Sequence, residues 1–267
     1  MSRWCAIRVR RRPGTDRVRR LCLLFGLCLA LAAAPVSAGP GQLLCRAVGH
    51  DGERYRVCRI DLGQYEVRLV WRGPDGRPLA SLWRLPERLD ARPVLLAMNA
   101  GMFRPDLSPA GLYIEGGVRL RQLNTADGPG NFHLKPNGVL LLGPDGARIL
   151  ETGDYAQAQP PAEYATQSGP MLVIDGALHP ALLADSRSRY QRNGACAPDP
   201  QTLLLAITEQ PVTLHAFARL FRDALGCDAA LYLDGSVSSL FDPAIGRRDF
   251  QRLLGPMIVV LGDPVPP

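Results

Sequence analysis

Residues 202–239, TLLLAITEQPVTLHAFARLFRDALGCDAALYLDGSVSS, decide the fold that we expect for this chain. The apolar run 202–207 is typical of a buried strand, and Thr213 is a good N-cap for the amphipathic helix that follows. Gly226 would end this helix, and a second apolar run leads directly into Asp234. The order strand, helix, strand predicts a right-handed crossover between two parallel neighbours. Asp234 would then lie at the carboxyl end of its strand, where ligands of α/β sheets usually bind.

The polar end of this stretch permits two interpretations. It places the Asp234 carboxylate beside three serine hydroxyls, an arrangement that suits an active site. Asp-Gly pairs also form simple turns, so Asp234-Gly235 can be a turn without any chemistry. Local sequence alone leaves both interpretations open.

Most of the remaining chain predicts hairpins, because short apolar runs alternate with Asp-Gly, Gly-Gly and Pro-containing turns. The expected strands are 65–71, 94–98, 112–115, 118–120, 138–142, 147–150, 171–174 and 257–261. Asp75, Asp145 and Asp175 each precede a glycine in such turns, so we interpret them as turn residues rather than catalytic ones. The predicted fold class is α+β: a mixed, largely antiparallel sheet of hairpins with one strand-helix-strand crossover near the C-terminus.

Residues 1–38 have the pattern of a secretory signal peptide. Several arginines precede the apolar run 21–34, and Val36-Ser37-Ala38 fits a small-residue cleavage site. A membrane anchor is the alternative, but the apolar run of about 14 residues is shorter than the roughly 20 needed to span a bilayer. We therefore expect export, into the periplasm, with residues 39–267 as one domain and no membrane span after cleavage.

The basic charge of the chain belongs to this leader. The full chain has 31 basic and 25 acidic residues and a formal net charge of +6. Without the eight basic residues and the one acidic residue of 1–38, 23 basic and 24 acidic residues remain, a net charge of about −1. The domain therefore lacks the basic excess typical of nucleic-acid binders, and we expect no nucleic-acid partner.

Four cysteines remain after the leader: Cys45, Cys58, Cys196 and Cys227. In an oxidising compartment they allow three pairings. We favour Cys45 with Cys58 across an N-terminal hairpin, and Cys196 with Cys227 holding a loop to the end of the helix. A metal site of four thiolates is the alternative, but no pair has the short C-x₂₋₄-C spacing that it needs. We expect no metal and no cofactor.

Two polar segments have no explanation as turns. Asn99 follows the expected strand 94–98, where its amide can bind a sugar hydroxyl or cap a backbone turn. Lys135, in the segment 130–138, is the only lysine of the chain. One interpretation is that a binding site here needs the compact charge of an ammonium group. The other is that Lys135 is an ordinary surface residue of a solvated loop.

Two further segments carry hydroxyls and arginines. The segment 165–170 contains Ser168 but lacks the G-x-S-x-G elbow of many serine hydrolases. The segment 185–194 has three arginines suited to phosphate or carboxylate, although such a charge run is also typical of wet surface. The histidines show no metal spacing, and His215 has the position of a packing or surface residue on the helix.

Seven short motifs in this order resemble the phosphodiester glycosidase family, relatives of the uncovering enzyme that removes N-acetylglucosamine from mannose 6-phosphate diesters. The motifs are Met98–Phe103, Gly111–Tyr113, Asn131-Phe132, Lys135–Gly138, Gln167–Leu172, Arg192-Asn193 and Leu233–Ser239. The resemblance spans roughly residues 65 to 262 and is greatest to the bacterial exported branch. Two motifs differ: the family's Asp-Gly-Gly-Gly-Ser-Ser is DGSVSS here, and its Arg-Thr-Ala-Ile-Gly is RNGAC.

The resemblance implies hydrolysis of a sugar-1-phosphodiester at the anomeric carbon, in envelope or exopolysaccharide metabolism. Such a reaction passes through an oxocarbenium-like state that needs a nearby carboxylate, which we assign to Asp234. Arg192 would stabilise the charge of the leaving phosphate. The expected substrate-binding residues are Asn99, Gly101, Phe103, Asn131, Lys135, Gln167, Ser168, Gly169, Asn193, Gly235 and Ser238.

Two other functions remain open. One is a non-catalytic glycan- or envelope-binding module of the same fold, which the altered glycine run favours. The other is a serine-dependent ester hydrolase that would use Ser168 or Ser238.

Overall fold

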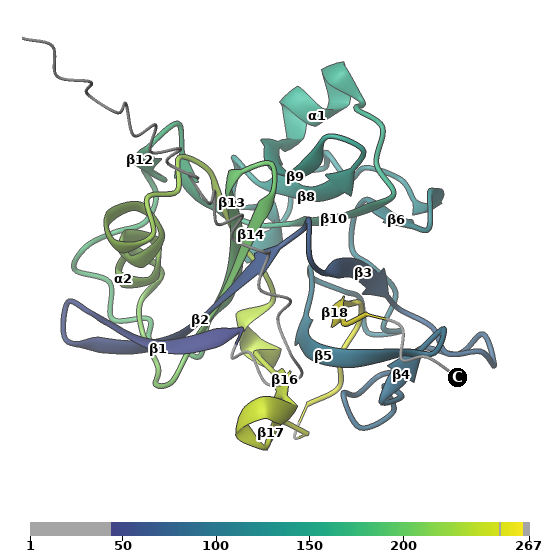
Figure 1. Cartoon of the computed structure of the whole chain (residues 1–267). Helices are drawn as coiled ribbons and strands as arrows, with labels where there is room; N and C mark the ends of the chain where they lie inside the picture. Colours follow the sequence, from purple (N-terminus) through teal and green to yellow (C-terminus); the bar gives the residue numbers. More distant parts are fainter. Residues whose placement is uncertain (1–43, 251, 264–267) are drawn as a thin grey trace, which may run out of the picture. The chain divides into compact units, whose positions relative to one another are not determined.

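The computed structural model describes residues 44–250 and 252–263, which lie in one compact unit, Gly39–Pro267. The expected signal peptide, 1–38, lies outside the described residues. No helix among the described residues has the length and hydropathy of a membrane span. Every strand pairing in this part of the chain is antiparallel, in three sheets (Figure 1).

The largest sheet has seven strands in the order β1-β2-β14-β13-β15-β11-β12. The strands are β1 Cys45–His50, β2 Glu53–Asp61, β11 Met171–Ile174, β12 Ala177–Leu178, β13 Asn193–Asp199, β14 Thr202–Thr208 and β15 Ala230–Tyr232. The helix α2, Leu214–Arg219, continues as a π-helical turn, η2, Leu220–Ala224, and packs Phe217 and Phe221 against this sheet. Thr213 caps α2, as predicted: its hydroxyl accepts a hydrogen bond from the Ala216 N–H at 3.1 Å.

The predicted pairing of the two strands around α2 is wrong. β14 and β15 run in the same direction but are not neighbours, because β13 lies between them and pairs antiparallel with both. β13 forms a tight hairpin with β14, in which Asp199 pairs with Thr202, and so takes the edge of β14 that β15 would need. The start of β13, residues 193–194, lies in the polar segment 185–194, which was not among the expected strands.

The second sheet has six strands in the order β17-β16-β5-β18-β3, with β4 also paired to β5. The strands are β3 Glu66–Val70, β4 Arg88–Leu89, β5 Arg92–Asn99, β16 Leu240–Asp242, β17 Arg247–Arg248 and β18 Met257–Leu261, and η4, Pro243–Ile245, joins β16 to β17. The expected strands 94–98 and 257–261 lie at the centre of this sheet, where β18 pairs with both β5 and β3.

The third sheet has five strands in the order β7-β6-β10-β8-β9. The strands are β6 Tyr113–Glu115, β7 Val118–Arg121, β8 Gly138–Gly143, β9 Gly146–Glu151 and β10 Tyr164–Ser168, with η1, Asn131–His133, before β8. Both predicted hairpins are confirmed, and Gly146 turns with a φ of 90°, which favours glycine. The helix α1, Thr152–Ala158, was not predicted from the sequence; the Glu151 carboxylate caps it, 2.7 Å from the Gly153 N–H.

The main core lies between the three sheets. Its buried members include Leu69 of β3, Leu140 of β8 and Leu205 of β14. Burial of side chains from all three sheets in one cluster holds the sheets together through the hydrophobic effect. The ends of β5, β13 and β15 therefore have fixed positions relative to one another.

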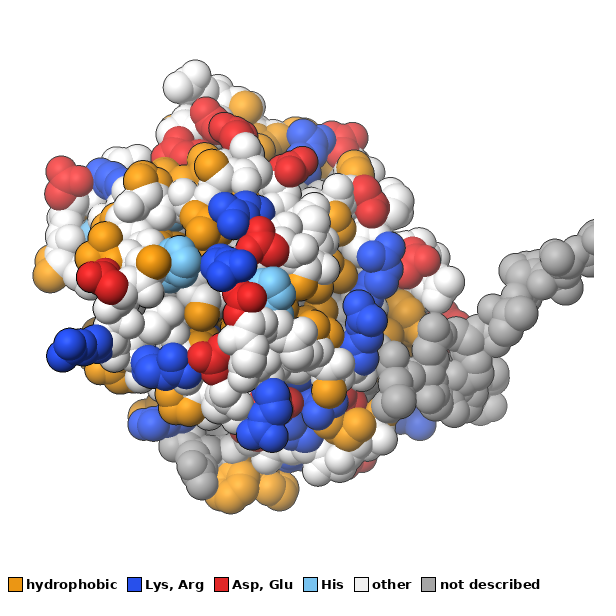
Figure 2. Space-filling model, turned by 90° about the vertical axis from the view of Figure 1, so that its left-hand side faces the viewer, with side chains coloured by type: hydrophobic (Ala, Val, Ile, Leu, Met, Phe, Trp, Pro, Cys, Tyr) orange, Lys and Arg blue, Asp and Glu red, His pale blue; other side chains and the backbone are white. Residues whose placement is uncertain are grey.

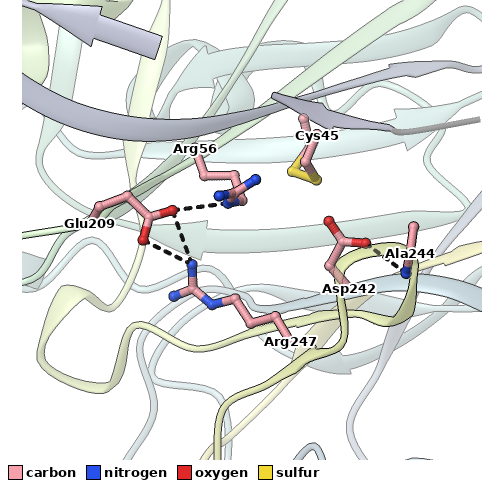
Figure 3. Close-up of a disulfide and its surroundings, with 7 residues drawn as sticks. Cys45, Arg56, Glu209, Asp242, Ala244 and Arg247 are labelled. Carbon is pink, nitrogen blue, oxygen red and sulfur yellow. Dashed lines mark hydrogen bonds and ion pairs between the residues drawn. A yellow bond between two sulfur atoms is a disulfide. The ribbon is translucent and has the colours of Figure 1, made fainter. Parts of the chain in front are cut away.

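Both predicted disulfides are confirmed. Cys45–Cys58 joins directly paired residues of β1 and β2, and Cys196–Cys227 joins β13 to the segment after η2. Cys196 lies on a strand rather than on the predicted loop. Figure 3 also shows Glu209, which bridges Arg56 and Arg247 at 2.9 and 3.2 Å.

The side of the molecule that carries α2 and β1 has charges of both signs. Figure 2 shows this side, with basic and acidic side chains intermixed. Arg219 pairs here with Asp51 at 2.8 Å and with Asp223 at 3.0 Å. Intermixed charges differ from the continuous basic surface that binds a nucleic-acid backbone.

Candidate active site

Asp234 follows β15 and lines a cavity of about 510 Å³. The rest of the cavity wall comes from two other segments, 102–110 after β5 and 124–133 before β8. Asp234 is the only carboxylate among the residues that line it. The structure thus places Asp234 in a concave site built from all three sheets, as an active site requires.

Burial raises the pKa of the Asp234 carboxyl above its ordinary value, because loss of water disfavours the charged form. The Ser236 hydroxyl, 2.7 Å from Asp234 Oδ1, and the Ser236 backbone N–H donate hydrogen bonds that lower the pKa and offset part of this effect. The structure shows no ion pair between Asp234 and any described cation. No described cation therefore neutralises the ionised form of Asp234, and a cationic transition state would supply the opposite charge that this form lacks.

A buried pair of amides fixes the backbone of Asp234. Asn99, at the end of β5, donates from Nδ2 to the Asp234 carbonyl at 2.8 Å. Asn193, at the start of β13, donates from Nδ2 to the Asn99 carbonyl at 2.9 Å and to Asn99 Oδ1 at 3.0 Å. Neither amide lines the cavity. Asn99 and Asn193 therefore connect the three strand ends, and we expect them to position Asp234 rather than to contact a sugar.

Arg192 lies behind the cavity wall. Its buried guanidinium donates to the Tyr232 hydroxyl at 3.0 Å and to the carbonyls of Val212 and Ser188 at 3.2 and 3.1 Å. Tyr232 lines the cavity, and Arg192 does not. Burial raises the pKa of the Tyr232 hydroxyl, against the opposing effect of Arg192. One tyrosine thus separates the guanidinium from the space beside Asp234.

Close packing explains why three of the expected site residues are glycines. A Cβ on Gly235 would lie 2.0 Å from the Tyr232 hydroxyl oxygen, and a Cβ on Gly101 would lie 2.5 Å from the Gln167 carbonyl oxygen. A Cβ on Gly169 would lie 2.6 Å from Asn137 Cβ. A side chain at any of these positions would collide with its packed neighbours, and at Gly235 it would displace Tyr232 of the cavity wall.

Gln167 and Lys135 hold the segment 124–133 in place. Gln167 Oε1 accepts from the Asn124 N–H at 2.9 Å, and its Nε2 donates to the Asn124 carbonyl at 2.8 Å. Lys135 Nζ donates to the Thr125 carbonyl at 2.8 Å and to Asp127 Oδ1 at 2.6 Å. The hydrogen bond from Lys135 lowers the pKa of Asp127. Neither Gln167 nor Lys135 lines the cavity.

The two candidate serine nucleophiles lack a base. Ser168 is fully buried, and its hydroxyl has no hydrogen-bond partner among the described residues. Ser238 donates to the Gly235 carbonyl at 2.9 Å. The structure shows no hydrogen bond between either hydroxyl and a histidine in the part of the chain that it describes. This geometry does not provide the activated serine of an ester hydrolase.

Of the other predicted residues, Phe103 and Asn131 line the cavity beside Asp234. Arg104 and His133, which were not predicted as site residues, also line it. Arg104 is exposed and has no ion pair with a described residue, and His133 holds its Nδ1 3.0 Å from the Ala126 carbonyl. A carbonyl only accepts, so Nδ1 carries the proton and Nε2 stays available. In the sequence, Arg104 directly follows the motif residue Phe103, and His133 directly follows the motif residue Phe132. This adjacency was the sequence signal that could have identified them as site residues.

No group of three histidine, cysteine, aspartate or glutamate side chains suitable for a metal ion occurs within 44–250 and 252–263. The four cysteines that the alternative metal site needed are joined as two disulfides.

Comparison with known proteins points to one family. The family described as phosphodiester glycosidase matches residues 93–261. The protein named "Uncharacterized protein YigE" of Escherichia coli strain K12 is 30% identical over 176 residues, 66% of this chain and 69% of that protein. Among solved structures, the zebrafish N-acetylglucosamine-1-phosphodiester alpha-N-acetylglucosaminidase catalytic domain, auto-inhibited by its pro-peptide, superposes with a TM-score of 0.58 at 15% identity and covers 85% of each chain. At this identity, the likeness concerns the fold.

Proposed function

Because this chain belongs to the phosphodiester glycosidase family, we propose that it hydrolyses a glycosyl phosphodiester in the cavity that holds Asp234. The observation that supports this most directly is the solitary, half-buried carboxylate of Asp234 in a cavity also lined by Arg104 and His133. This combination provides a negative charge for a sugar cation and positive charge for a phosphate.

In the proposed reaction, the bond between the anomeric carbon and the phosphate oxygen breaks, and water supplies the new hydroxyl. The products are a free sugar and a phosphomonoester, and the proton from water passes to solvent or to the phosphate. Positive charge develops at the anomeric carbon, and the ionised Asp234 carboxylate stabilises it. A phosphate is a good leaving group, so the reaction needs less general-acid help than an ordinary glycosidase.

The phosphate would bind between Arg104 and His133. The Arg104 guanidinium can donate two parallel hydrogen bonds to phosphate oxygens, and His133 lines the same cavity. Arg192 acts in this proposal through Tyr232, whose hydroxyl it orients at 3.0 Å. Arg192 is thus a positioning residue, and Asp234 and Arg104 contact the substrate.

We also propose that the protein works outside the cytoplasm, on an envelope or exopolysaccharide substrate. The leader pattern of 1–38 and the two disulfides support export. Mass spectrometry of the protein recovered from the periplasmic fraction of a Gram-negative host tests this. A mature chain that begins at Gly39 is expected, and a cytoplasmic chain that keeps its leader would refute export.

The test of the activity is incubation of the purified protein with a panel of sugar-1-phosphodiesters, including envelope polymers, with free reducing sugar as the readout. Release of sugar and of a phosphomonoester in equal amounts supports the proposal. Binding without release would favour the alternative of a glycan-binding module. One observation favours that alternative: Ser236 stands where the family has glycine and binds the Asp234 carboxylate.

A further inference from the structure

A second cavity, of about 380 Å³, adjoins the first, and Ser236 lines both. Its walls come from the segment after Asp234, from Gln191, and from residues 247–250 and 252. Three arginines, Arg247, Arg248 and Arg252, line it together with one acidic residue, Asp249. The excess of guanidinium groups makes this cavity suited to an anion.

Arg248 is the side chain in this cavity whose guanidinium is held in place with its N–H donors free to bind an anion. Arg247 donates to Glu209 and Asp249, so its charge is already neutralised. Arg248 makes no hydrogen bond or ion pair with any described residue, and its guanidinium carbon lies 4.3 Å from the Phe241 ring centre and 5.1 Å from that of Trp83. Two aromatic rings hold the planar group while its N–H donors stay free. A guanidinium fork held in this way matches the oxygens of a phosphate.

An exposed aromatic pair lies beside Arg248. Trp83 and Phe250 contact each other edge to face, with ring centres 6.2 Å apart, and are 59% and 61% exposed. Phe250 lines the second cavity. Large apolar side chains left this open at a cavity are typical of a binding surface. Their rings offer a surface for the apolar face of a sugar.

We propose that the second cavity binds another sugar phosphate unit of the same substrate, with its phosphate on Arg248 and its sugar on the Trp83–Phe250 pair. This inference rests on the proposed glycosyl phosphodiester activity and specifies its substrate class: a chain of at least two successive sugar phosphate units. Because Ser236 belongs to both cavities, one such chain can occupy both. No bond forms or breaks in the second cavity.

The test compares two probes, oligomers of N-acetylglucosamine 1-phosphate with one and with two phosphodiester linkages. Binding is measured by calorimetry in the Asp234→Asn background, where turnover is stopped. We expect the two-linkage probe to bind about tenfold more tightly, which corresponds to one charge-assisted contact. Arg248→Gln should remove this difference, and Phe250→Ala should reduce it. Arg119→Gln, at an exposed arginine of β7 that lines neither cavity, should preserve it.

Equal affinity for the two probes, or no binding of either, overturns the inference, and so does an Arg248→Gln variant that weakens both probes alike. Thermal unfolding of each variant shows whether it is folded. Sugar release from the one-linkage probe by the unmodified protein tests the proposed activity separately. If no sugar is released and the Arg248-dependent preference for the two-linkage probe persists, the proposed activity is refuted and the proposed second binding site is supported.

Discussion

Asn99 of β5 donates a hydrogen bond to the Asp234 carbonyl at 2.8 Å, across 135 positions of sequence. The same side chain accepts, through Oδ1, from the Ser239 N–H at 2.9 Å. One amide thus holds both ends of the short loop that carries the candidate carboxylate. The position of Asp234 depends on a residue that does not line its cavity.

Replacement of Asn99 by alanine should therefore lower both stability and activity. It leaves the Asp234 carbonyl, the Ser239 N–H and the Asn193 amide without this partner. The free energy of unfolding should therefore fall by about 1–3 kcal/mol. Because the loop that carries Asp234 is then less well positioned, the variant should release sugar at least about tenfold more slowly. Urea unfolding and turnover measure the two effects. Gln159→Ala, at an exposed amide, is the control; unchanged turnover per folded Asn99→Ala molecule would show that the amide supports only the fold.

Replacement of Asp234 by asparagine should remove at least about three orders of magnitude in turnover, because the neutral amide cannot stabilise the sugar cation. The fold should persist, since burial disfavours the charge that is removed. Asp185→Asn, at an exposed carboxylate outside the cavity, should turn over substrate normally. Turnover by Asp234→Asn close to that of the unmodified protein would exclude Asp234 as the essential carboxylate.

The activity should show an acid limb set by Asp234. Burial raises its pKa, so kcat/KM should fall with decreasing pH at a pH above the usual aspartate value of 3.8. The Ser236 hydroxyl stabilises the charged form, so Ser236→Ala should raise the pKa further and move the acid limb to higher pH. The measurement is kcat/KM against pH for both proteins. A limb that stays in place, or that moves to lower pH, would contradict this account of the carboxylate.

Asp242 offers a second pH prediction, for stability. This buried carboxylate of β16 accepts from the Ala244 N–H at 3.2 Å through Oδ1, while Oδ2 has no partner among the described residues (Figure 3). Burial raises its pKa, so the folded state binds the proton more tightly than the unfolded state. Its contribution to stability is present below the unfolded pKa of about 3.9 and is lost as pH rises through the folded value. Asp242→Asn should unfold at a higher urea concentration than the unmodified protein at pH 7 and at a similar one at pH 4. A lower midpoint at pH 7 would show that the negative charge of Asp242 stabilises the fold, through Arg56 and Arg247.

Local sequence rules predicted the hairpins well and the pairing of the distant strands β14 and β15 poorly. The Thr213 cap and the turns at Gly117 and Gly146 depend on backbone conformations within a few residues, and these are visible in sequence. The insertion of β13 between β14 and β15 depends on competition between distant edges, which local patterns do not report.

The candidate site shows the same division. Motif order predicted that Asp234, Phe103 and Asn131 belong to one site, and they line one cavity. Burial of Arg192 behind Tyr232 could not be predicted, because an arginine in a polar segment has the same sequence pattern whether its partners are a phosphate or three protein groups.

The central position of β18 affects how this protein is made. β18 pairs with β3 and β5, yet the ribosome synthesises it after more than half the length of the chain has followed β5. During translation, β3 and β5 therefore wait with unsatisfied backbone edges, which attract other strands and invite aggregation. This sheet can be completed only after β18 has been synthesised, so a chaperone that shields the nascent strands β3 and β5 should raise the yield of folded protein.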